Sequence, residues 1–277
     1  MKLALGTVQF GLDYGITNQD GKAAEGEVEG ILDFARDSGI NILDTASSYG
    51  NSEQVLGDVG VDGCQIVTKT TPLRYGVDEV VKGFYQSLQH LNQKSIYGLL
   101  IHDINEVNDK EFEELFRQLR ELKQQGLINK IGFSTYTPEQ VDFLLENFDF
   151  DIIQLPFNVF DIRLVEGKQL QALKKKHIEI HARSVFLQGV LLNFDNLTDY
   201  FSTWNEQFSE YQVAIEKSGM SLLEYALNFV LNTQEIDRVL VGVNSEQHLR
   251  EIIQSAQKEG RSNAYFINDL NLLNPSL

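Results

Sequence analysis

Cysteine, proline and basic residues are scarce in this chain of 277 residues, and each scarcity excludes something. Cys64 is the single cysteine, so an internal disulfide and a cysteine-ligated zinc site are both excluded. It lies in the apolar run Cys64–Val67, and we interpret it as a buried structural thiol. Only four prolines occur, and no Ser/Pro-rich or Gly/Ser-rich stretch marks a linker. One domain over residues 1–277 is therefore the simpler interpretation.

Positive charge is outnumbered as well. The chain has 23 Lys and Arg residues against 40 Asp and Glu residues, which gives a formal net charge of −17. Nucleic acid and anionic lipid both require a basic surface, so we expect neither as a partner. No apolar run approaches the roughly 20 residues that cross a bilayer, and the N-terminus lacks a signal-peptide pattern. These absences predict a reduced, cytoplasmic protein.

Short apolar runs recur along the chain, and each is followed by a segment with helical character. Their length and β-branched content are typical of strands in a buried parallel sheet. Residues 27–38 and 109–125 carry apolar side chains at helical spacing, while Thr137–Pro138 and Ser245 are typical helix starts. The strand-like runs cover residues 3–7, 40–44, 64–69, 96–102, 128–134, 152–155, 178–183 and 238–242.

Eight strand-like runs that alternate with helices over about 250 residues predict a single (β/α)8 barrel, the TIM barrel of the α/β class. A doubly wound sheet is the alternative. However, no Gly-x-Gly-x-x-Gly pattern follows the first strand, and no Gly-x-x-x-x-Gly-Lys-Ser/Thr pattern occurs anywhere. A nucleotide that binds this chain does not use either of those phosphate-binding loops.

The predicted strands end in polar residues or glycine. In an α/β barrel the carboxyl ends of the strands meet at one rim, where the chemistry of such barrels takes place. We therefore expect these residues to converge, together with Tyr49, which lies in the loop just after Asp44. The strand-end residues are Thr7, Asp44, Lys69, His102, Ser134, Gln154, Arg183 and Gly242.

Tyr49 has neighbours that suit proton transfer. A phenol is a poor acid–base catalyst at neutral pH unless a nearby positive charge favours the phenolate, and Lys69 would supply that charge. Asp44 would keep Lys69 charged, and His102 could donate to an oxygen on which negative charge develops. The alternatives are a purely architectural Asp44–Lys69 pair and a barrel histidine with only structural contacts.

Metal chemistry is not expected. His177 and His181 lie close in sequence within a strand-like run, but no third ligand accompanies them, so packing is the better interpretation.

The segment Gly39–Gly50, followed by Asn51-Ser52-Glu53, resembles the signature of the aldo-keto reductase family. Ile66–Lys69 is similar to the strand that bears the family's lysine, and Leu100–His102 to the strand that bears its histidine. The resemblance implies hydride transfer from a nicotinamide cofactor to an aldehyde or ketone. The catalytic residues that it implies are Asp44, Tyr49, Lys69 and His102.

The resemblance extends to the cofactor side and makes NADPH the expected cofactor, with NADH possible. Arg183 stands where many members stack a tyrosine on the nicotinamide. Gly242 and His248 stand where members that prefer NADPH place Lys or Arg, which is why NADH stays open. The cofactor-binding residues expected are Gly6, Thr7, Ser134, Thr135, Gln154, Arg183, Ser184, Phe186, Leu187, Gln188, Gly189, Gly242, Val243, Asn244, Gln247 and His248.

The opening segment Leu5–Gly15 resembles short bacterial reductases of surface-polysaccharide and nonulosonate sugar pathways. It suggests a small-molecule substrate with a sugar-derived carbonyl, and a pocket to which Gln9 and Tyr14 contribute. Two other functions stay open: an aldolase or isomerase with Lys69 as a Schiff base, and a non-catalytic nicotinamide-binding sensor or partner subunit. We expect a monomer or a weak homo-oligomer. Residues 193–218 either cover the cofactor or pad the barrel.

Overall fold

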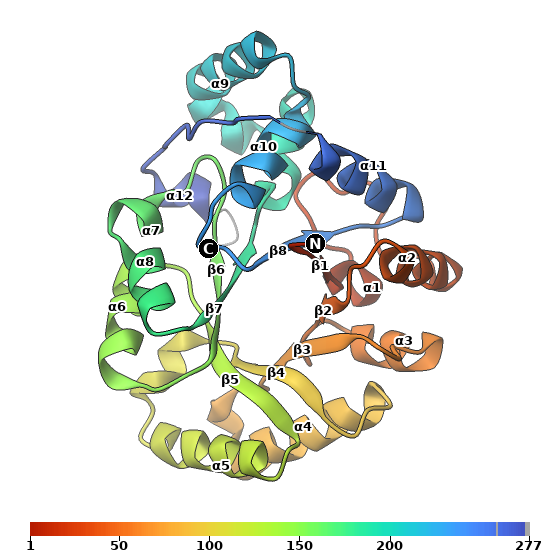
Figure 1. Cartoon of the computed structure of the whole chain (residues 1–277), viewed down its shortest axis with the longest axis vertical. Coiled ribbons are helices and arrows are strands. Elements are labelled where there is room, and N and C mark those ends of the chain that lie inside the picture. The colour runs from red at the N-terminus through yellow and green to blue at the C-terminus, as the bar shows by residue number, and fades with distance from the viewer. Residues whose placement is uncertain (259, 275–277) are drawn as a thin grey trace.

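The computed structural model describes residues 1–258 and 260–274, and its centre is a closed barrel of eight parallel strands in sequence order (Figure 1). The first and last strands pair directly, with Leu5 beside Val241, and this pairing closes the barrel. The predicted (β/α)8 barrel is confirmed. The strands are β1 Leu3–Gly6, β2 Ile42–Asp44, β3 Gln65–Lys69, β4 Ile96–Ile101, β5 Ile128–Ser134, β6 Ile152–Pro156, β7 Glu179–Arg183 and β8 Arg238–Gly242.

Helices surround the barrel, and their starts follow the local sequence. Thr137 caps α6 and Ser221 caps α10 in capping boxes that satisfy the first free backbone N–H groups. Ser245 caps α11 through a hydrogen bond from the His248 N–H. The helices are α1 Val8–Gly11, α2 Glu25–Asp37, α3 Ser52–Val59, α4 Val77–His90, α5 Phe112–Gln124, α6 Pro138–Asn147, α7 Arg163–Glu166, α8 Gln169–Lys175, α9 Asn205–Ser218, α10 Leu222–Leu231, α11 Glu246–Gln257 and α12 Leu270–Leu273.

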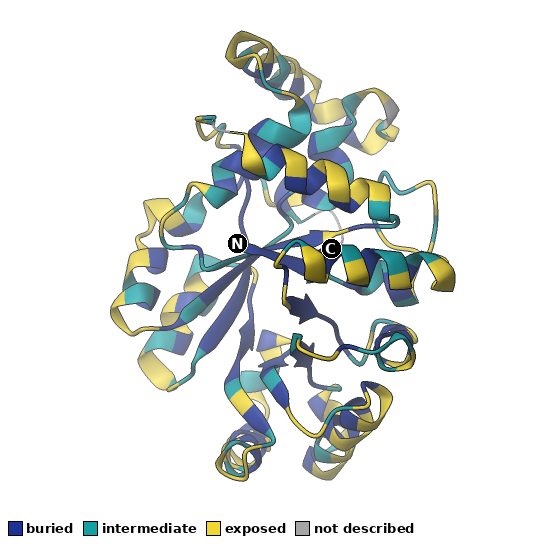
Figure 2. Ribbon diagram, turned by 45° about the vertical axis from the view of Figure 1, so that its right-hand side comes forward, coloured by how far each residue is buried: buried dark blue, intermediate teal, exposed yellow. Residues whose placement is uncertain are grey.

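Alternation along the strands separates two apolar layers. Outward side chains such as Ile180 and Ala182 join the large cluster between barrel and helices. A separate, smaller cluster fills the barrel, as in other packed α/β barrels. Most strand residues are buried, whereas the helices expose one face (Figure 2). The interior cluster consists of Ala4, Ile42, Val67, Leu100, Ile152 and Leu240.

Glu179 fills the opposite end of the barrel from the predicted site. It forms an ion pair with Lys130 and accepts hydrogen bonds from the Tyr97 hydroxyl at 2.6 Å and from His181 Nε2 at 2.7 Å. Burial raises the pKa of Glu179, but the hydrogen bonds from these three partners lower it far below its usual range. His181 therefore has a structural contact in this network. His177 lies before β7, with a positive φ of 59°, and not in the strand as expected.

Residues 193–218 form two 3-10 turns and α9, and they build a second hydrophobic cluster beside the barrel. Trp204, Phe208 and Tyr211 pack there against residues of α10 and α12. The Trp204 Nε1–H also donates to Asp269 Oδ2 at 3.0 Å. These side chains therefore pad the outside of the barrel.

Cys64 differs from the expectation. It lies just before β3 and is half-buried, not enclosed in the core, because the buried run begins only with Ile66.

The close approach of α3 to the end of α4 generates a stability prediction. A methyl group on Gly57 would lie 1.9 Å from the His90 carbonyl oxygen, so we expect Gly57→Ala to lower the free energy of unfolding by about 1–3 kcal/mol. Gly26→Ala in α2 meets no heavy atom within 4 Å and should raise it by up to about 1 kcal/mol. Urea denaturation followed by circular dichroism measures both. Equal stability of the two variants would contradict the close approach.

Candidate active site

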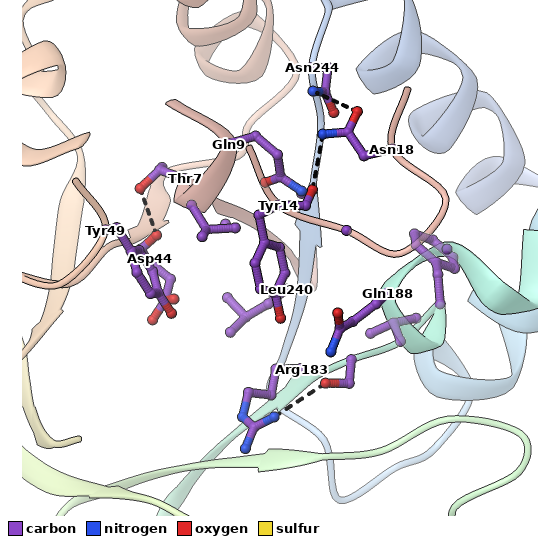
Figure 3. A pocket seen from close by; sticks show the side chains of 18 of the residues that line it. Thr7, Gln9, Tyr14, Asn18, Asp44, Tyr49, Arg183, Gln188, Leu240 and Asn244 are labelled. Atoms are coloured by element: carbon purple, nitrogen blue, oxygen red, sulfur yellow. Dashed lines mark hydrogen bonds between the residues drawn. The ribbon is translucent and has the colours of Figure 1, made fainter. Parts of the chain in front are cut away.

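The predicted strand-end residues all line one cavity of about 720 Å³ at the mouth of the barrel. Figure 3 shows three of them, Thr7, Asp44 and Arg183. They converge because all eight strands are parallel, so their carboxyl ends share one rim. Tyr49 lines the same cavity, from the loop after β2. The sequence-based expectation that these side chains come together is therefore confirmed as a matter of geometry.

Lys69 and Asp44 form the floor of this cavity. Lys69 Nζ donates to both carboxylate oxygens of Asp44, at 3.0 and 2.8 Å, and to the Thr45 carbonyl oxygen at 2.8 Å. The amide of Gln154 reaches across the barrel from β6 and donates to Asp44 Oδ1 at 2.6 Å. The ammonium thus has three acceptors, and the carboxylate has donors from two walls of the barrel.

Lys69 carries its charge at neutral pH. Burial by itself lowers the pKa of this ammonium, but the charges and hydrogen bonds of Asp44 and Tyr49 raise it above its ordinary value. Its Nζ lies 4.9 Å from the centre of the Tyr49 ring. A fixed positive charge therefore stands beside the phenol ring.

The loop that carries Tyr49 is held by unusually close backbone contacts. A methyl group on Gly11 would lie 1.8 Å from the Tyr49 carbonyl oxygen, so the backbone of α1 lies directly against the backbone of this loop. Ser52 joins the loop to the first strand end, since its hydroxyl donates to the Thr7 carbonyl oxygen at 2.8 Å. Thr7 in turn donates to the Asp44 carbonyl oxygen at 2.9 Å. These contacts fix the phenol relative to the floor.

His102 faces Tyr49 across the cavity. The two rings meet edge to face, with their centres 6.2 Å apart, and Ser48 Oγ lies 3.4 Å from His102 Nδ1. Burial, together with the charge of Lys69, lowers the pKa of His102 to about 4. The imidazole is therefore neutral at physiological pH and can donate one hydrogen bond.

Arg183 occupies the opposite wall. Its guanidinium lies 4.2 Å from the centre of the Tyr136 ring, donates to the Thr135 carbonyl oxygen at 3.0 Å and contacts Ser184 Oγ at 3.2 Å. The side chain is thus held by stacking and neutral acceptors, and none of its described contacts is a carboxylate. It adds a permanent positive charge to the cavity.

The long loop after α1 spans the cavity and contacts the loops after β7 and β8. The Ile16 N–H donates to the Gln188 carbonyl oxygen at 3.0 Å, and Thr17 packs so closely on Gly189 that a methyl there would lie 1.9 Å from Thr17 Oγ1. On the other side, Asn244 Nδ2 donates to the Gly21 carbonyl oxygen at 2.6 Å. Because this loop crosses the mouth of the cavity, the cavity has the form of a cleft between the loop and the strand ends.

Most of the cofactor-binding residues expected from the sequence line the cleft, but four do not. Thr135 is buried against the backbone of Gln154, and Leu187 packs in the second hydrophobic cluster. Val243 points into the main core. Gln247 is exposed on α11 and donates to Glu251.

Several lining residues were not expected from the sequence. Tyr136 directly follows Thr135, an expected cofactor-binding residue, so its position in the sequence could have indicated that it lines the cleft. Most of the others lie in loops or short helical turns, where sequence periodicity does not indicate side-chain direction. They are Val8, Gly15, Thr17, Asn18, Gln19, Asp20, Tyr136, Val185, Leu192, Asn193 and Leu240.

A parallel barrel whose rim brings together a phenol, an imidazole and a buried lysine defines an α/β-barrel enzyme. The model of the aldo/keto reductase family matches residues 2–271, and the chain belongs to this family, whose members are oxidoreductases that use nicotinamide cofactors. It is 26% identical over 249 residues to an uncharacterised oxidoreductase of Bacillus subtilis, covering 82% of this chain and 81% of that protein. It is also 26% identical to L-galactose dehydrogenase of Arabidopsis thaliana, covering 83% of this chain and 78% of that protein.

Solved structures share the fold. An aldo-keto reductase of Bacillus halodurans in its holo form superimposes with a TM-score of 0.76 at 20% identity, over 94% of this chain and 88% of that chain. Glycerol dehydrogenase of Gluconobacter oxydans gives a TM-score of 0.73 at 23% identity, over 94% of this chain and 88% of that chain.

No helix in residues 1–258 and 260–274 is long and apolar enough to span a membrane.

The buried ion pair generates a second prediction. Asp44→Ala leaves the Lys69 ammonium buried without its charged partner, and we expect the free energy of unfolding to fall by about 3–5 kcal/mol. The double variant Asp44→Leu/Lys69→Met removes both charges and should recover most of that loss. Chemical denaturation of the three proteins measures the difference. A single variant as stable as the unchanged protein would refute the pairing.

The environment of His102 generates a third. With a pKa of about 4 in the folded protein and about 6.5 in the unfolded chain, the unfolded chain binds more protons between these values. The contribution of His102 to stability is therefore present above pH 6.5 and is lost as the pH falls toward 4. NMR titration of the imidazole should give a midpoint near 4, and His102→Gln should weaken the acid dependence of unfolding. A midpoint near 6.5 would disprove the burial effect.

Proposed function

We propose that this chain reduces an aldehyde or ketone to an alcohol with a reduced nicotinamide dinucleotide, and that Tyr49 is the proton donor. The observation that carries the proposal is the common cavity of Tyr49, His102 and the Lys69–Asp44 pair at the barrel rim. A phenol beside a fixed ammonium and a neutral imidazole can polarise one carbonyl oxygen from two sides.

The bound nicotinamide would supply a hydride to the carbonyl carbon. Tyr49 then donates its hydroxyl proton to the oxygen on which negative charge develops, and the adjacent Lys69 ammonium stabilises the phenolate that remains. His102 is neutral and donates a hydrogen bond to the same oxygen when Ser48 donates to its Nδ1. Asp44 holds Lys69 charged and in place throughout.

The residues of the cleft fit a dinucleotide. Gln9 Oε1 is a buried acceptor that has no partner among the described residues, and it lies in the cleft beside Gly242. The loop after β7 keeps positive φ angles at Ser184 and Gln188, which is the kind of strain that binding loops retain. The family resemblance favours NADPH, and NADH is the other candidate.

The substrate that we propose is a sugar-derived carbonyl compound. The relatives include L-galactose dehydrogenase of Arabidopsis thaliana and D-arabinose 1-dehydrogenase of Saccharomyces cerevisiae, the latter 28% identical over 132 residues. The amide side chains of Gln9, Asn18 and Gln188 line the cleft and suit hydroxyl-rich ligands. We further propose that the protein acts in the cytoplasm as a monomer or weak homo-oligomer.

A Schiff-base mechanism at Lys69 is disfavoured. Such a step requires a neutral amine, whereas the Lys69 ammonium is held charged by Asp44 and has its hydrogen-bonding positions filled.

Tyr49→Phe tests the proposal. We expect kcat for carbonyl reduction to fall by about 10²–10⁴-fold, because the proton donor is removed, while cofactor affinity stays within a few-fold. Steady-state assays on a panel of keto-sugars and aldehydes, together with fluorescence titration of the cofactor, separate the two effects. Tyr85→Phe, an exposed position on α4, is the control. Unchanged turnover in Tyr49→Phe would remove Tyr49 from the mechanism.

A further inference from the structure

The cleft is charged very unevenly along its length. The described lining residues include one lysine, Lys69, and one arginine, Arg183. Both lie at strand ends, in the part of the cleft near Tyr49. Figure 3 shows Asn18 and Asn244 together in another part of the cleft, away from Asp44, Tyr49 and Arg183. The residues that line this distal part are Asn18, Gln19, Asp20, Asn244 and His248, of which Asp20 is the acidic one.

The adenosine half of a dinucleotide must lie in this distal part if the proposed function is correct. The nicotinamide has to reach a carbonyl held by Tyr49 and His102, so the other half extends away from them along the cleft. The distal lining comes from the loop that holds Asn18 and Asp20, and from Asn244 and His248 at the start of α11.

Cations near the distal part are engaged elsewhere. Lys22 Nζ donates to Asn51 Oδ1 at 2.6 Å, just before α3. Arg250 donates to Glu246 Oε1 at 2.7 Å, and its guanidinium lies 3.9 Å from the centre of the Phe34 ring. Neither side chain lines the cleft. The partial positive charge at the N-terminus of α11 is offset by the carboxylate of Glu246 in the first turn of the helix.

Asp20 is held at the rim by a network of neutral groups. Its N–H donates to Asn18 Oδ1 at 3.0 Å, and Asn18 Nδ2 donates to the Gly21 carbonyl oxygen at 2.9 Å. Asn244 Nδ2 donates to the same carbonyl at 2.6 Å, so the turn around Asp20 is fixed to the end of β8. No lysine or arginine in residues 1–258 or 260–274 forms an ion pair with Asp20.

NADPH and NADH differ at one position, the 2′-oxygen of the adenosine ribose. A phosphate monoester there carries a charge of about −1.5 to −2 at pH 7 and requires cationic or multiple donor partners when it loses water. A free 2′-hydroxyl is a donor and is satisfied by a carboxylate, as in many NAD sites. A distal wall with Asp20 and without lysine or arginine matches the hydroxyl and repels the phosphate.

We infer that this cleft selects NADH over NADPH and that Asp20 is the specificity-determining residue. The inference rests on the proposed function, because it assumes that a nicotinamide dinucleotide occupies the cleft. It opposes the preference that the family resemblance alone favours.

Binding measurements test this inference without a substrate. The purified protein is titrated with NADH and with NADPH at one fixed ionic strength, and cofactor fluorescence gives each Kd. We expect Kd for NADPH to exceed Kd for NADH at least tenfold. Asp20→Asn removes the repulsion and should narrow that ratio several-fold, mainly through tighter NADPH binding. His248→Arg places a fixed cation in the distal wall and should narrow it further.

Asp37→Asn is the matched control. It makes the same charge change on the exposed end of α2, outside the cleft, and should leave the ratio unchanged. NADPH binding as tight as NADH binding in the unchanged protein would overturn the inference, and so would a ratio that Asp20→Asn does not alter. Failure of both cofactors to bind would instead overturn the proposed function on which the inference rests.

Discussion

The buried ion pair between Lys69 and Asp44 is the constraint on which the rest of the site depends. Only 1% of the Lys69 side chain and 6% of the Asp44 side chain are exposed. Removing either charge from water costs several kcal/mol, so the pair persists only because every donor of the ammonium has an acceptor and the carboxylate gains a further donor from Gln154. These bonds join β2, β3 and β6 at the centre of the barrel. They also keep one positive charge under the Tyr49 ring.

The rim of the cleft is built on different physics from its floor. Amide side chains and backbone carbonyls join the loop of residues 12–23 to the ends of β7 and β8, through Gln188 and Asn244. These hydrogen bonds join neutral groups, so they enclose the cleft without adding a net charge to it. The floor of the cleft therefore holds a buried charge pair, while its rim consists of amide side chains and backbone groups.

The local sequence pattern was enough to predict the barrel and the strand-end residues of the candidate site. Apolar runs that alternate with helical segments predict all eight strands to within about two residues at their ends. They do so because the strands of a buried parallel sheet are apolar on both faces. Helix caps such as Thr137 and Ser245 are equally local. Since parallel strands share one rim, the polar residues at or near the ends of these runs were enough to predict that Asp44, Lys69, His102 and Gln154 lie together.

The sequence by itself determined the fold and the polar residues at the strand ends, because both follow from periodicity and strand direction. The tertiary structure alone decided where loop side chains point. Thr135 turns into the core and its carbonyl accepts from Arg183, whose guanidinium stacks on Tyr136. The loop that carries Asp20 to the cleft is held by Asn244, more than two hundred positions later in the sequence. Such directions arise from contacts between distant segments, and no local pattern encodes them.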